Sequence, residues 1–461
     1  IARLNIDGSV DATLNPGTNS TVNALAQQAN GKLLVGGAFT SLDFTARNRI
    51  GRLHGDGRVD AAFNPNANGN VKALLVQADG KLVIGGSYTT IANVARNRIA
   101  RLNFDDSIDV GFNPGANGDV HSLAELIGGK LLVAGTFSSI GNQARGGIAL
   151  LDAAGTVDAS FAPTSNGTVY SLAQQVDKNI LVGGMFSVMA GASRNGLARM
   201  DLAGKIDQNY NPGVNGTVNA MALQPDGKLL VGGTFNMIGG LTRNNIARLN
   251  VDGSADASFN ASITGTVNSL VLQADGSVMV GGNFTAANSS TRNNVALLYP
   301  TGVVDLSFNP GADATVFALA LQGDGKLAVG GAFSTVGGQA RSNLARLSAP
   351  QAVTDSLQFI GYSNGGSVIR WIRSASAPEL VRPPELQVST NGTTYAPVET
   401  MLRTSNGWTF SGYNAPQLPL FYLRATGVAA SGQYAGSGSL IQNARQASTL
   451  NSDGIFRSGF D

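Results

Sequence analysis

Short apolar runs alternate with turn-forming residues over the first three quarters of the chain. The segment KLLVGGAFT at residues 32–40 returns as KLVIGGSYT, KLLVAGTFS, ILVGGMFS, KLLVGGTFN, VMVGGNFT and KLAVGGAFS. The second glycine of the segment recurs at a constant step of 49 residues, at Gly37, Gly86, Gly135, Gly184, Gly233, Gly282 and Gly331. A fixed period of this length indicates a repeat architecture.

Each unit contains four extended segments. In the unit that begins at residue 217 these are TVNAMALQ, KLLVGGTF, NIARLN and SADASFNAS, separated by turns such as PDG and VDG. Gly and Asn accept the positive φ that tight turns between strands require. A flat sheet of so many strands would leave long edges exposed, whereas a ring protects them. The sequence therefore predicts a seven-bladed β-propeller over residues 1–349, with four strands per blade.

The chain carries one surplus strand motif. IARL at residues 1–4 recurs as LARL at residues 344–347, which gives eight copies for seven blades. Either a terminal segment closes the ring beside the last blade, or the surplus strand pairs with a neighbouring molecule.

The strings DGKLLVGGTF and TRNNIARLNVDGSADASFN resemble the delta-60 repeat, a bacterial family regarded as β-propellers of surface or exported proteins. The resemblance covers residues 1 to about 349. It implies the propeller fold and a secreted or cell-surface location, and most members of that family have no assigned activity.

Two charged positions recur in every unit. Both sets are predicted to be structural staples between strands, turns or blades, because a guanidinium presents a planar fork of donors to carboxylate or carbonyl oxygens. The arginines are Arg47, Arg96, Arg145, Arg194, Arg243, Arg292 and Arg341, and the aspartates are Asp11, Asp60, Asp109, Asp158, Asp207, Asp256 and Asp305. The alternative is a ring of calcium or anion sites, but calcium needs more oxygen ligands than the NVDGSAD turn provides. We therefore predict no cofactor, with structural calcium as the alternative.

Candidate ligand positions are those at which the units differ. One slot near the start of the first strand is occupied by Asn23, Lys72, His121, Tyr170, Asn219, Asn268 and Phe317. The loops from SLDFTA to TVGGQA form a second variable ring. These positions are the candidate ligand face, although drift on an exposed surface would produce the same variation.

The acid and base content argues against catalysis. Before residue 350 there is one glutamate, Glu125, and the two histidines, His54 and His121, lie in different units. No pair of carboxylates stands out for glycoside hydrolysis. The chain has no cysteine, which excludes disulfides and thiolate chemistry. The prediction is a protein that is not an enzyme.

The charge balance gives no reason to propose a nucleic acid partner. The chain has 31 Lys and Arg against 29 Asp and Glu, a net charge of +2. No run approaches the ~18 apolar residues of a membrane span, so no transmembrane segment is expected.

Composition changes after Pro350, where both tryptophans occur. Extended segments separated by Asn-Gly and Pro turns predict a small antiparallel β-sandwich over residues 350–435. FYLRATG resembles a strand of fibronectin type III modules, which would make Tyr422 the tyrosine that braces the corner. Residues 436–461 are predicted to be a flexible tail, whose ending, DGIFRSGFD, resembles a terminal signature of exported proteobacterial proteins or serves for docking.

Three functions are compatible with these features. The first is a non-catalytic extracellular or cell-surface scaffold in bacteria that binds protein or glycan through a propeller face. The second is a self-assembling subunit of a filament or surface layer, joined through the terminal strand, the sandwich and the tail. The third is a polysaccharide-active enzyme that uses Glu125.

Overall fold

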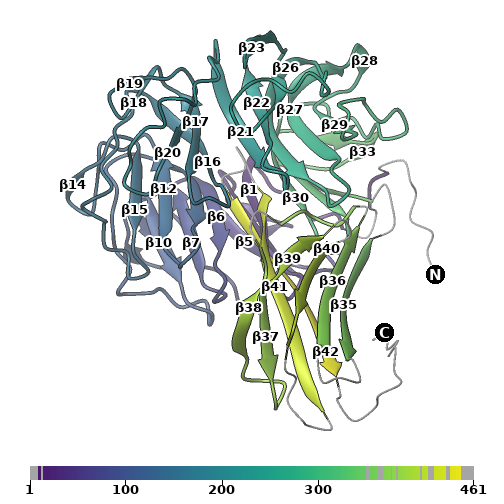
Figure 1. Ribbon diagram of the computed structural model, residues 1–461. Coiled ribbons are helices and arrows are strands. Elements are labelled where there is room, and N and C mark those ends of the chain that lie inside the picture. The colour runs from purple at the N-terminus through teal and green to yellow at the C-terminus, as the bar shows by residue number, and fades with distance from the viewer. Residues whose placement is uncertain are drawn as a thin grey trace.

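The computed structural model describes residues 9–11, 14–348, 353–361, 367–374, 376–380, 383–404, 407–413, 420–431 and 437–447. All the regular elements in these ranges are β-strands. They form a seven-bladed β-propeller followed by a small β-sandwich (Figure 1). The predicted all-β fold class is therefore confirmed.

Each blade has a three-stranded antiparallel sheet with an inner, a middle and an outer strand. Neighbouring inner strands contact one another around the complete ring, and β1 contacts β30. In blade order the strands are β1 (Val22–Gln27), β2 (Leu33–Gly37) and β5 (Ile50–Leu53); β6 (Val71–Val76), β7 (Leu82–Gly86) and β10 (Ile99–Leu102); β11 (Val120–Glu125), β12 (Leu131–Gly135) and β15 (Ile148–Leu151); β16 (Thr168–Gln174), β17 (Ile180–Met185) and β20 (Leu197–Met200); β21 (Thr217–Leu223), β22 (Leu229–Thr234) and β25 (Ile246–Leu249); β26 (Ile263–Leu272), β27 (Val278–Ala287) and β29 (Val295–Leu298); β30 (Val316–Leu321), β31 (Leu327–Gly331) and β34 (Leu344–Leu347).

A short hairpin, with strands of two residues, lies between the middle and outer strands of each blade. The second variable ring of loops was predicted at this place. In blade 6 the first arm of this hairpin is the end of β27. The remaining hairpin strands are β3 (Ser41–Leu42), β4 (Thr45–Ala46), β8 (Thr90–Ile91), β9 (Val94–Ala95), β13 (Ser139–Ile140), β14 (Gln143–Ala144), β18 (Val188–Met189), β19 (Ala192–Ser193), β23 (Met237–Ile238), β24 (Leu241–Thr242), β28 (Ser290–Thr291), β32 (Thr335–Val336) and β33 (Gln339–Ala340).

The repeated Gly-Gly pair marks close contacts within and between blades. A Cβ on Gly37 would lie 2.1 Å from the carbonyl oxygen of Thr21 in the same blade, and a Cβ on Gly36 would lie 2.6 Å from Cγ1 of Val71 in the next blade. The second glycine is kept in all seven blades, because a Cβ there would meet a main-chain oxygen, whereas the first is replaced by Ala134 in blade 3. The pair therefore sets the spacing of the ring.

The predicted fourth segment of each blade pairs through one bridging residue beside the outer strand. Val59 bridges Leu53 in blade 1, and Val10 bridges Leu347 in blade 7 in the same way. Residues 9–11 thus close the ring beside the last blade. The copy of the motif at residues 1–4 lies outside the described residues, so its pairing with another molecule remains a hypothesis.

The C-terminal strands form two layers of four strands packed face to face, one of which continues through β42 into the sheet of blade 2. Trp371 pairs with Trp408 across strands, and both belong to the core between the sheets. One sheet contains β35 (Thr354–Gly361), β36 (Ser367–Ser374), β40 (Gly407–Ser411) and β39 (Leu402–Thr404); the other contains β38 (Ala396–Thr400), β37 (Glu385–Ser389), β41 (Phe421–Ser431) and β42 (Ser437–Ala447).

The prediction that the flexible tail begins at residue 436 is wrong for residues 437–447. These residues form β42, which pairs with β41 along its whole length. Leu440 and Ile441 are buried in this strand. The polar composition of the segment concealed a strand whose hydrogen bonds are supplied mainly by its neighbour β41. The end of the tail, 448–461, lies outside the described residues.

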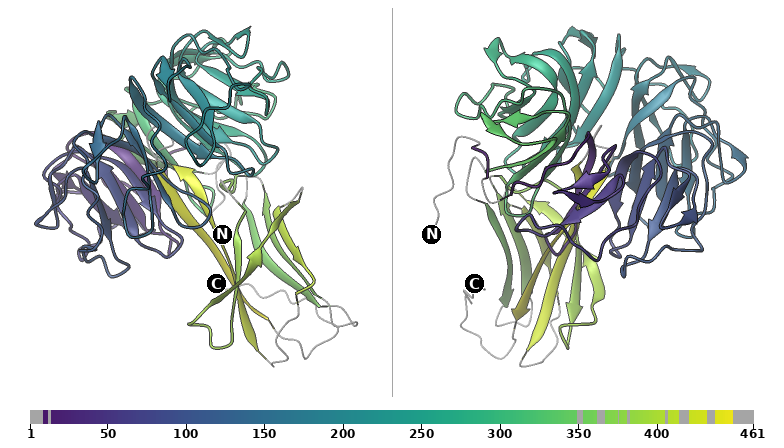
Figure 2. Two further views of the ribbon diagram at one scale, coloured as in Figure 1. Left: turned by 60° about the vertical axis from the view of Figure 1, so that its left-hand side comes forward. Right: turned by 180° about the vertical axis from the view of Figure 1, so that it is seen from behind.

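The β41–β42 hairpin reaches from the sandwich into the centre of the propeller (Figure 2). Strand β42 contacts β1, β6 and β11, and β41 contacts β1, β26 and β30. Gly438 pairs in parallel with Leu75 of β6, and the hydroxyl of Ser439 accepts a hydrogen bond of 2.9 Å from the Gln27 N–H. One end of the propeller channel is therefore occupied by the chain's own second domain.

Candidate functional site

The variable slot predicted as a ligand face lies at the beginning of the inner strands. Lys72 follows the first residue of β6, while Gly438 of the sandwich pairs near the other end of that strand, at Leu75. The seven slot residues thus surround the end of the channel opposite the sandwich. The end of the channel that the slot residues surround is therefore the end available to a ligand.

Several slot residues bind to the next blade. The Asn219 amide donates to the carbonyl oxygen of Val267 over 2.9 Å, and the Asn268 amide donates to that of Val316 over 3.2 Å. The Lys72 ammonium lies 2.7 Å from the Asp119 carboxylate. Asn219 and Asn268 are buried, whereas Asn23, Lys72, His121, Tyr170 and Phe317 are half-buried.

His121 and Tyr170 form an edge-to-face pair, with ring centroids 5.5 Å apart. Burial, reinforced by the positive charge of Lys72, lowers the pKa of His121 to about 4. The imidazole is therefore neutral at neutral pH. The neutral ring carries one N–H donor and one acceptor nitrogen.

The first arginine set binds main-chain oxygens. The Arg47 guanidinium donates to the carbonyl oxygens of Asp60 and Ala61 at 3.2 and 3.1 Å. Arg96, Arg145, Arg194, Arg243 and Arg292 reach the equivalent carbonyl in their own blades, and Arg341 donates to Ala340. This set joins the outer loop of a blade to the turn that follows.

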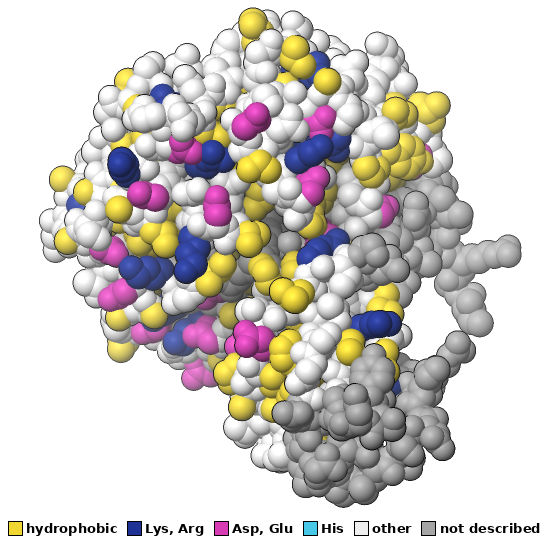
Figure 3. Space-filling model, viewed as in Figure 1, with side chains coloured by type: hydrophobic (Ala, Val, Ile, Leu, Met, Phe, Trp, Pro, Cys, Tyr) yellow, Lys and Arg dark blue, Asp and Glu magenta, His cyan; other side chains and the backbone are white. Residues whose placement is uncertain are grey.

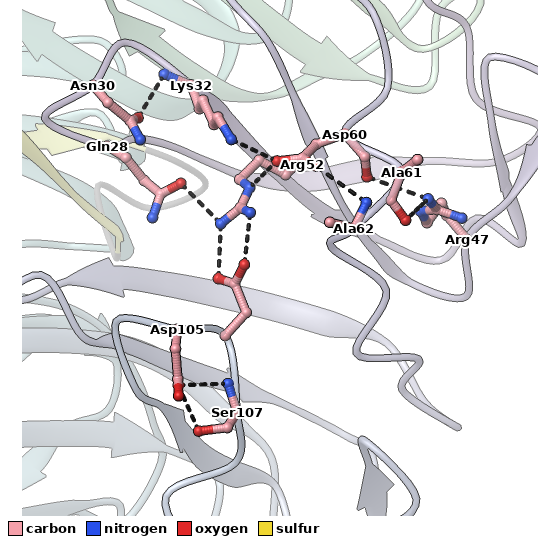
Figure 4. Close-up of polar contacts among 11 residues, drawn as sticks. Gln28, Asn30, Lys32, Arg47, Arg52, Asp60, Ala61, Ala62, Asp105 and Ser107 are labelled. Carbon is pink, nitrogen blue, oxygen red and sulfur yellow. Dashed lines mark hydrogen bonds and ion pairs between the residues drawn. The ribbon is translucent and has the colours of Figure 1, made fainter.

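A second arginine set, which the sequence analysis did not single out, binds the side chains of the repeated aspartates. Arg52 lies 2.8 Å from Asp60, which also binds Lys32 at 2.8 Å (Figure 4). The other pairs are Arg101 with Asp109, Arg199 with Asp207, Arg248 with Asp256 and Arg346 with Asp11. The available signal was the arginine inside the IARL motif, eight residues before the aspartate.

Leucine replaces this arginine in two blades, at Leu150 and Leu297. There Asp158 pairs with Lys130 at 2.8 Å, and Asp305 accepts from the Ser307 hydroxyl at 2.6 Å. The carboxylate is therefore kept in a polar contact in every blade.

Several second-set arginines also join successive blades. Arg52 forms a two-pronged pair with Asp106, with distances of 2.7 and 2.6 Å. Arg101, Arg199 and Arg248 donate to main-chain oxygens in the turn of the next blade at 2.6 to 2.7 Å. Burial acts to raise the pKa of Asp60, but the hydrogen bonds from Lys32 and Arg52 outweigh it and lower the pKa to about 2.

An apolar crevice lies between the sandwich and blades 3 to 5. Its lining includes Leu123, Leu172, Met221, Leu380 and Val428. Hydrophobic side chains gather where the propeller meets the sandwich (Figure 3). Glu125, the candidate acid of the enzyme hypothesis, also lines the crevice; its carboxylate accepts from the Gln77 amide and the Ala78 N–H. A second acid, Glu379 of the sandwich, lines the same crevice, where it pairs with Arg403 at 2.6 Å and burial raises its pKa. The other histidine, His54, lies in an outer turn of blade 1.

In the sandwich, the ring of Tyr422 lies against Gly392, where an added Cβ would meet it at 3.1 Å. Within the described ranges its hydroxyl has no hydrogen-bond partner. The bond that defines a tyrosine corner is thus not seen there.

Within the described ranges, no three His, Asp or Glu side chains come together in an arrangement that could hold a metal ion. Structural calcium stays a prediction. The same part of the chain has no helix long and apolar enough to cross a membrane.

The match to a protein family supports the fold. A search of curated proteins finds no match. A crystal structure of a protein of unknown function from Bacteroides caccae aligns with a TM-score of 0.33 and 14% identity, covering 51% of this chain and 79% of that one. The family model described as "Domain of unknown function (DUF5122) beta-propeller" matches seven times, at residues 28–63, 77–112, 129–161, 175–210, 224–259, 273–308 and 322–349. These matches cover just over half of the chain, one in each blade, and the chain therefore belongs to the DUF5122 β-propeller family.

Proposed function

We propose that this protein is a non-catalytic scaffold of the bacterial cell surface or exterior, which binds a protein or glycan at the propeller face opposite the sandwich. The observation that carries the proposal is the asymmetry of the channel. Its sandwich end is filled by the β41–β42 hairpin, whereas its other end is surrounded by the variable slot residues.

The chemistry of the slot supports recognition. Three blades carry asparagine there, and the other four carry Lys72, His121, Tyr170 and Phe317 on consecutive blades 2 to 4 and on blade 7. A cation, a neutral imidazole and two aromatic rings on one rim combine apolar contact area with hydrogen-bonding groups, as binding surfaces require. The proposed location and the absence of catalysis rest on the delta-60 resemblance and on the residue content.

The test is a variant in which all seven slots carry asparagine: Lys72→Asn, His121→Asn, Tyr170→Asn and Phe317→Asn. Asparagine suits the slot, because Asn219 and Asn268 already bond to the next blade there. The matched control is Ile127→Ala with Val176→Ala, which changes exposed turn residues beside the sandwich.

The probes are an array of bacterial surface glycans and a panel of purified outer-surface proteins. We expect a partner of the native protein to bind the all-asparagine variant at least tenfold more weakly and the control equally well. Equal binding by all three proteins would reject this face as the binding site.

The filament or surface-layer subunit is retained as the second candidate, because the sandwich leaves the exposed strand β38 at a sheet edge, where further strands can pair. Ordered fibres of the purified protein in negative stain, without added partner, would favour it over the scaffold.

A further inference from the structure

An open groove of about 620 Å³ lies between blades 4 and 5, on the loop side away from the sandwich. It is lined by Asn166, Met185, Phe186, Ser187, Asn195 and Val214–Thr217. Thr217 stands two residues before the slot residue Asn219. The groove therefore adjoins the proposed ligand face.

The equivalent place carries an asparagine in blades 5 to 7, whereas blades 1 and 2 carry Arg49 and Arg98 and blade 3 carries Gly147. The Asn245 carboxamide accepts from the Phe235 N–H at 3.0 Å and donates to the Ile263 carbonyl oxygen at 2.8 Å. Asn294 makes the same two bonds, to the Phe284 N–H and the Ala312 oxygen. The carboxamide thus bridges two main-chain groups of adjacent blades.

In blade 4 this position is Gly196, which has the same left-handed backbone, with φ of 67° against 64° for Asn245. The glycine supplies no carboxamide. The main-chain groups that the amide would join here are the N–H of Phe186 and the carbonyl of Val214, and both residues line the groove.

A second main-chain bond is also missing at this junction. At the other six junctions the N–H equivalent to that of Val214 donates to the loop of the preceding blade at 2.8 to 3.1 Å, as Ile263 donates to Asn244. Across the described residues, the Phe186 N–H and the N–H and carbonyl of Val214 have no hydrogen-bond partner.

We infer that this groove binds an extended peptide segment through the carboxamide side chain of an asparagine or glutamine. The Phe186 N–H donates to the side-chain oxygen of the ligand, and the Val214 carbonyl accepts from its NH₂ group. The Val214 N–H donates to a main-chain carbonyl of the same peptide. A partly buried N–H or carbonyl group costs free energy when it has no hydrogen-bond partner. The site therefore favours a ligand that supplies a partner for each of these three main-chain groups.

A peptide fits the groove better than an acetamido sugar. The vacant bonds are those that an Asn-Asn dipeptide makes in blade 5, where Asn244 offers a main-chain oxygen and Asn245 a carboxamide. An acetamido group offers one amide and no second carbonyl at that spacing. The aromatic ring of the groove, Phe186, is only 7% exposed, so it offers little surface for a sugar ring to stack on.

This inference rests on the proposed function, since it specifies the chemistry of a partner on the same face. The probe is the pentapeptide acetyl-Gly-Gly-Asn-Gly-Gly-amide, compared with the same peptide carrying alanine. Binding to the full chain is followed by the amide NMR signals of Phe186 and Val214. We expect the asparagine peptide to shift both signals and to bind roughly tenfold more tightly than the alanine peptide.

Two variants test the proposed carboxamide site of the groove. Gly196→Asn places a carboxamide of the chain itself between Phe186 and Val214, and the peptide-induced shifts should disappear. A Cβ at this position would lie 2.6 Å from the Gly216 oxygen, so folding of this variant has to be checked. Asn245→Gly removes the carboxamide from the equivalent site in blade 5 and should add peptide-induced shifts at Phe235.

Equal shifts with the alanine peptide, or shifts with N-acetylglucosamine trimer and none with either peptide, would overturn the inference. If the peptide does not bind while the all-asparagine variant still binds its partner more weakly than the native protein does, only the groove is rejected. If the peptide binds and that variant loses nothing, the groove stands and the proposed face fails.

Discussion

The carboxylate of Asp11 lies 2.9 Å from Nε and 2.8 Å from Nη2 of Arg346, a residue 335 positions later in the chain. The other blades that keep this arginine form the pair between residues eight positions apart, as in Arg52 and Asp60. In blade 7 the same chemistry joins the two ends of the propeller. The Asp11–Arg346 pair therefore closes the ring.

Arg346→Leu should destabilise the propeller more than the same change in an inner blade. Both side chains of the closing pair are buried, and loss of Arg346 leaves Asp11 with Lys326 alone, 3.2 Å away, which costs about 1–3 kcal/mol. Arg199→Leu is the matched control, since Asp207 is more exposed and leucine is native at Leu150 and Leu297. Urea unfolding of the two variants gives the comparison. Equal losses would mean that the pair is an ordinary contact within a blade.

Stability should fall in acid between about pH 4 and pH 2. The folded-state pKa of Asp60 is about 2, below its ordinary value of 3.8, so its contribution is complete above the unfolded pKa and is lost as pH falls through the folded one. The pKa of Asp158, which accepts from Lys130 and Ser160, is lowered to about 2 as well. For Asp60 the shift corresponds to about 2 kcal/mol.

The measurement is the free energy of unfolding from pH 5 to pH 2, with Asp60→Asn as the variant. Asp60→Asn should be less stable at pH 5 and should show a shallower decline with acid. A decline as steep as that of the native protein would assign the acid sensitivity to other groups.

His121 should add a second pH dependence, in a higher pH window. Burial, with the charge of Lys72, lowers its pKa to about 4, so the unfolded chain binds a proton that the folded chain does not between about pH 6.5 and pH 4. Stability should therefore decrease as pH falls through that window. His121→Asn should flatten the dependence, and NMR titration of the His121 ring should give a midpoint near 4. A midpoint near 6.5 would show that the ring is open to water.

Gly438→Val should displace the sandwich from the propeller. A Cβ on Gly438 would lie 2.6 Å from Cδ1 of Leu75, in a buried contact, and valine adds two methyl groups to it. Gly55→Val is the matched control, because nothing lies within 4 Å of a Cβ at Gly55. Small-angle X-ray scattering should show a longer particle for Gly438→Val alone. The Gln27 N–H, which donates to the Ser439 hydroxyl, should exchange its hydrogen faster in the same variant.

The blades could be predicted because their determinants are local. The 49-residue period, the turn residues and the Gly-Gly pairs act within a unit or on its immediate neighbour, as the contacts of Gly36 and Gly37 show. Recurrence also marked the charged staples. Their partners were not predicted in detail: Arg47 binds carbonyl oxygens, while Arg52, hidden in a strand motif, binds the Asp60 side chain.

The amino-acid sequence by itself determined the repeat, the ring of blades and the change to a second β-domain, since these follow from patterns of neighbouring residues. Only the tertiary structure decided that residues 437–447 form a strand, that the β41–β42 hairpin enters the channel, and that a groove opens between blades 4 and 5. Each of these depends on groups brought together from distant parts of the chain. Their hydrogen bonds and close contacts exist only once the ring has closed.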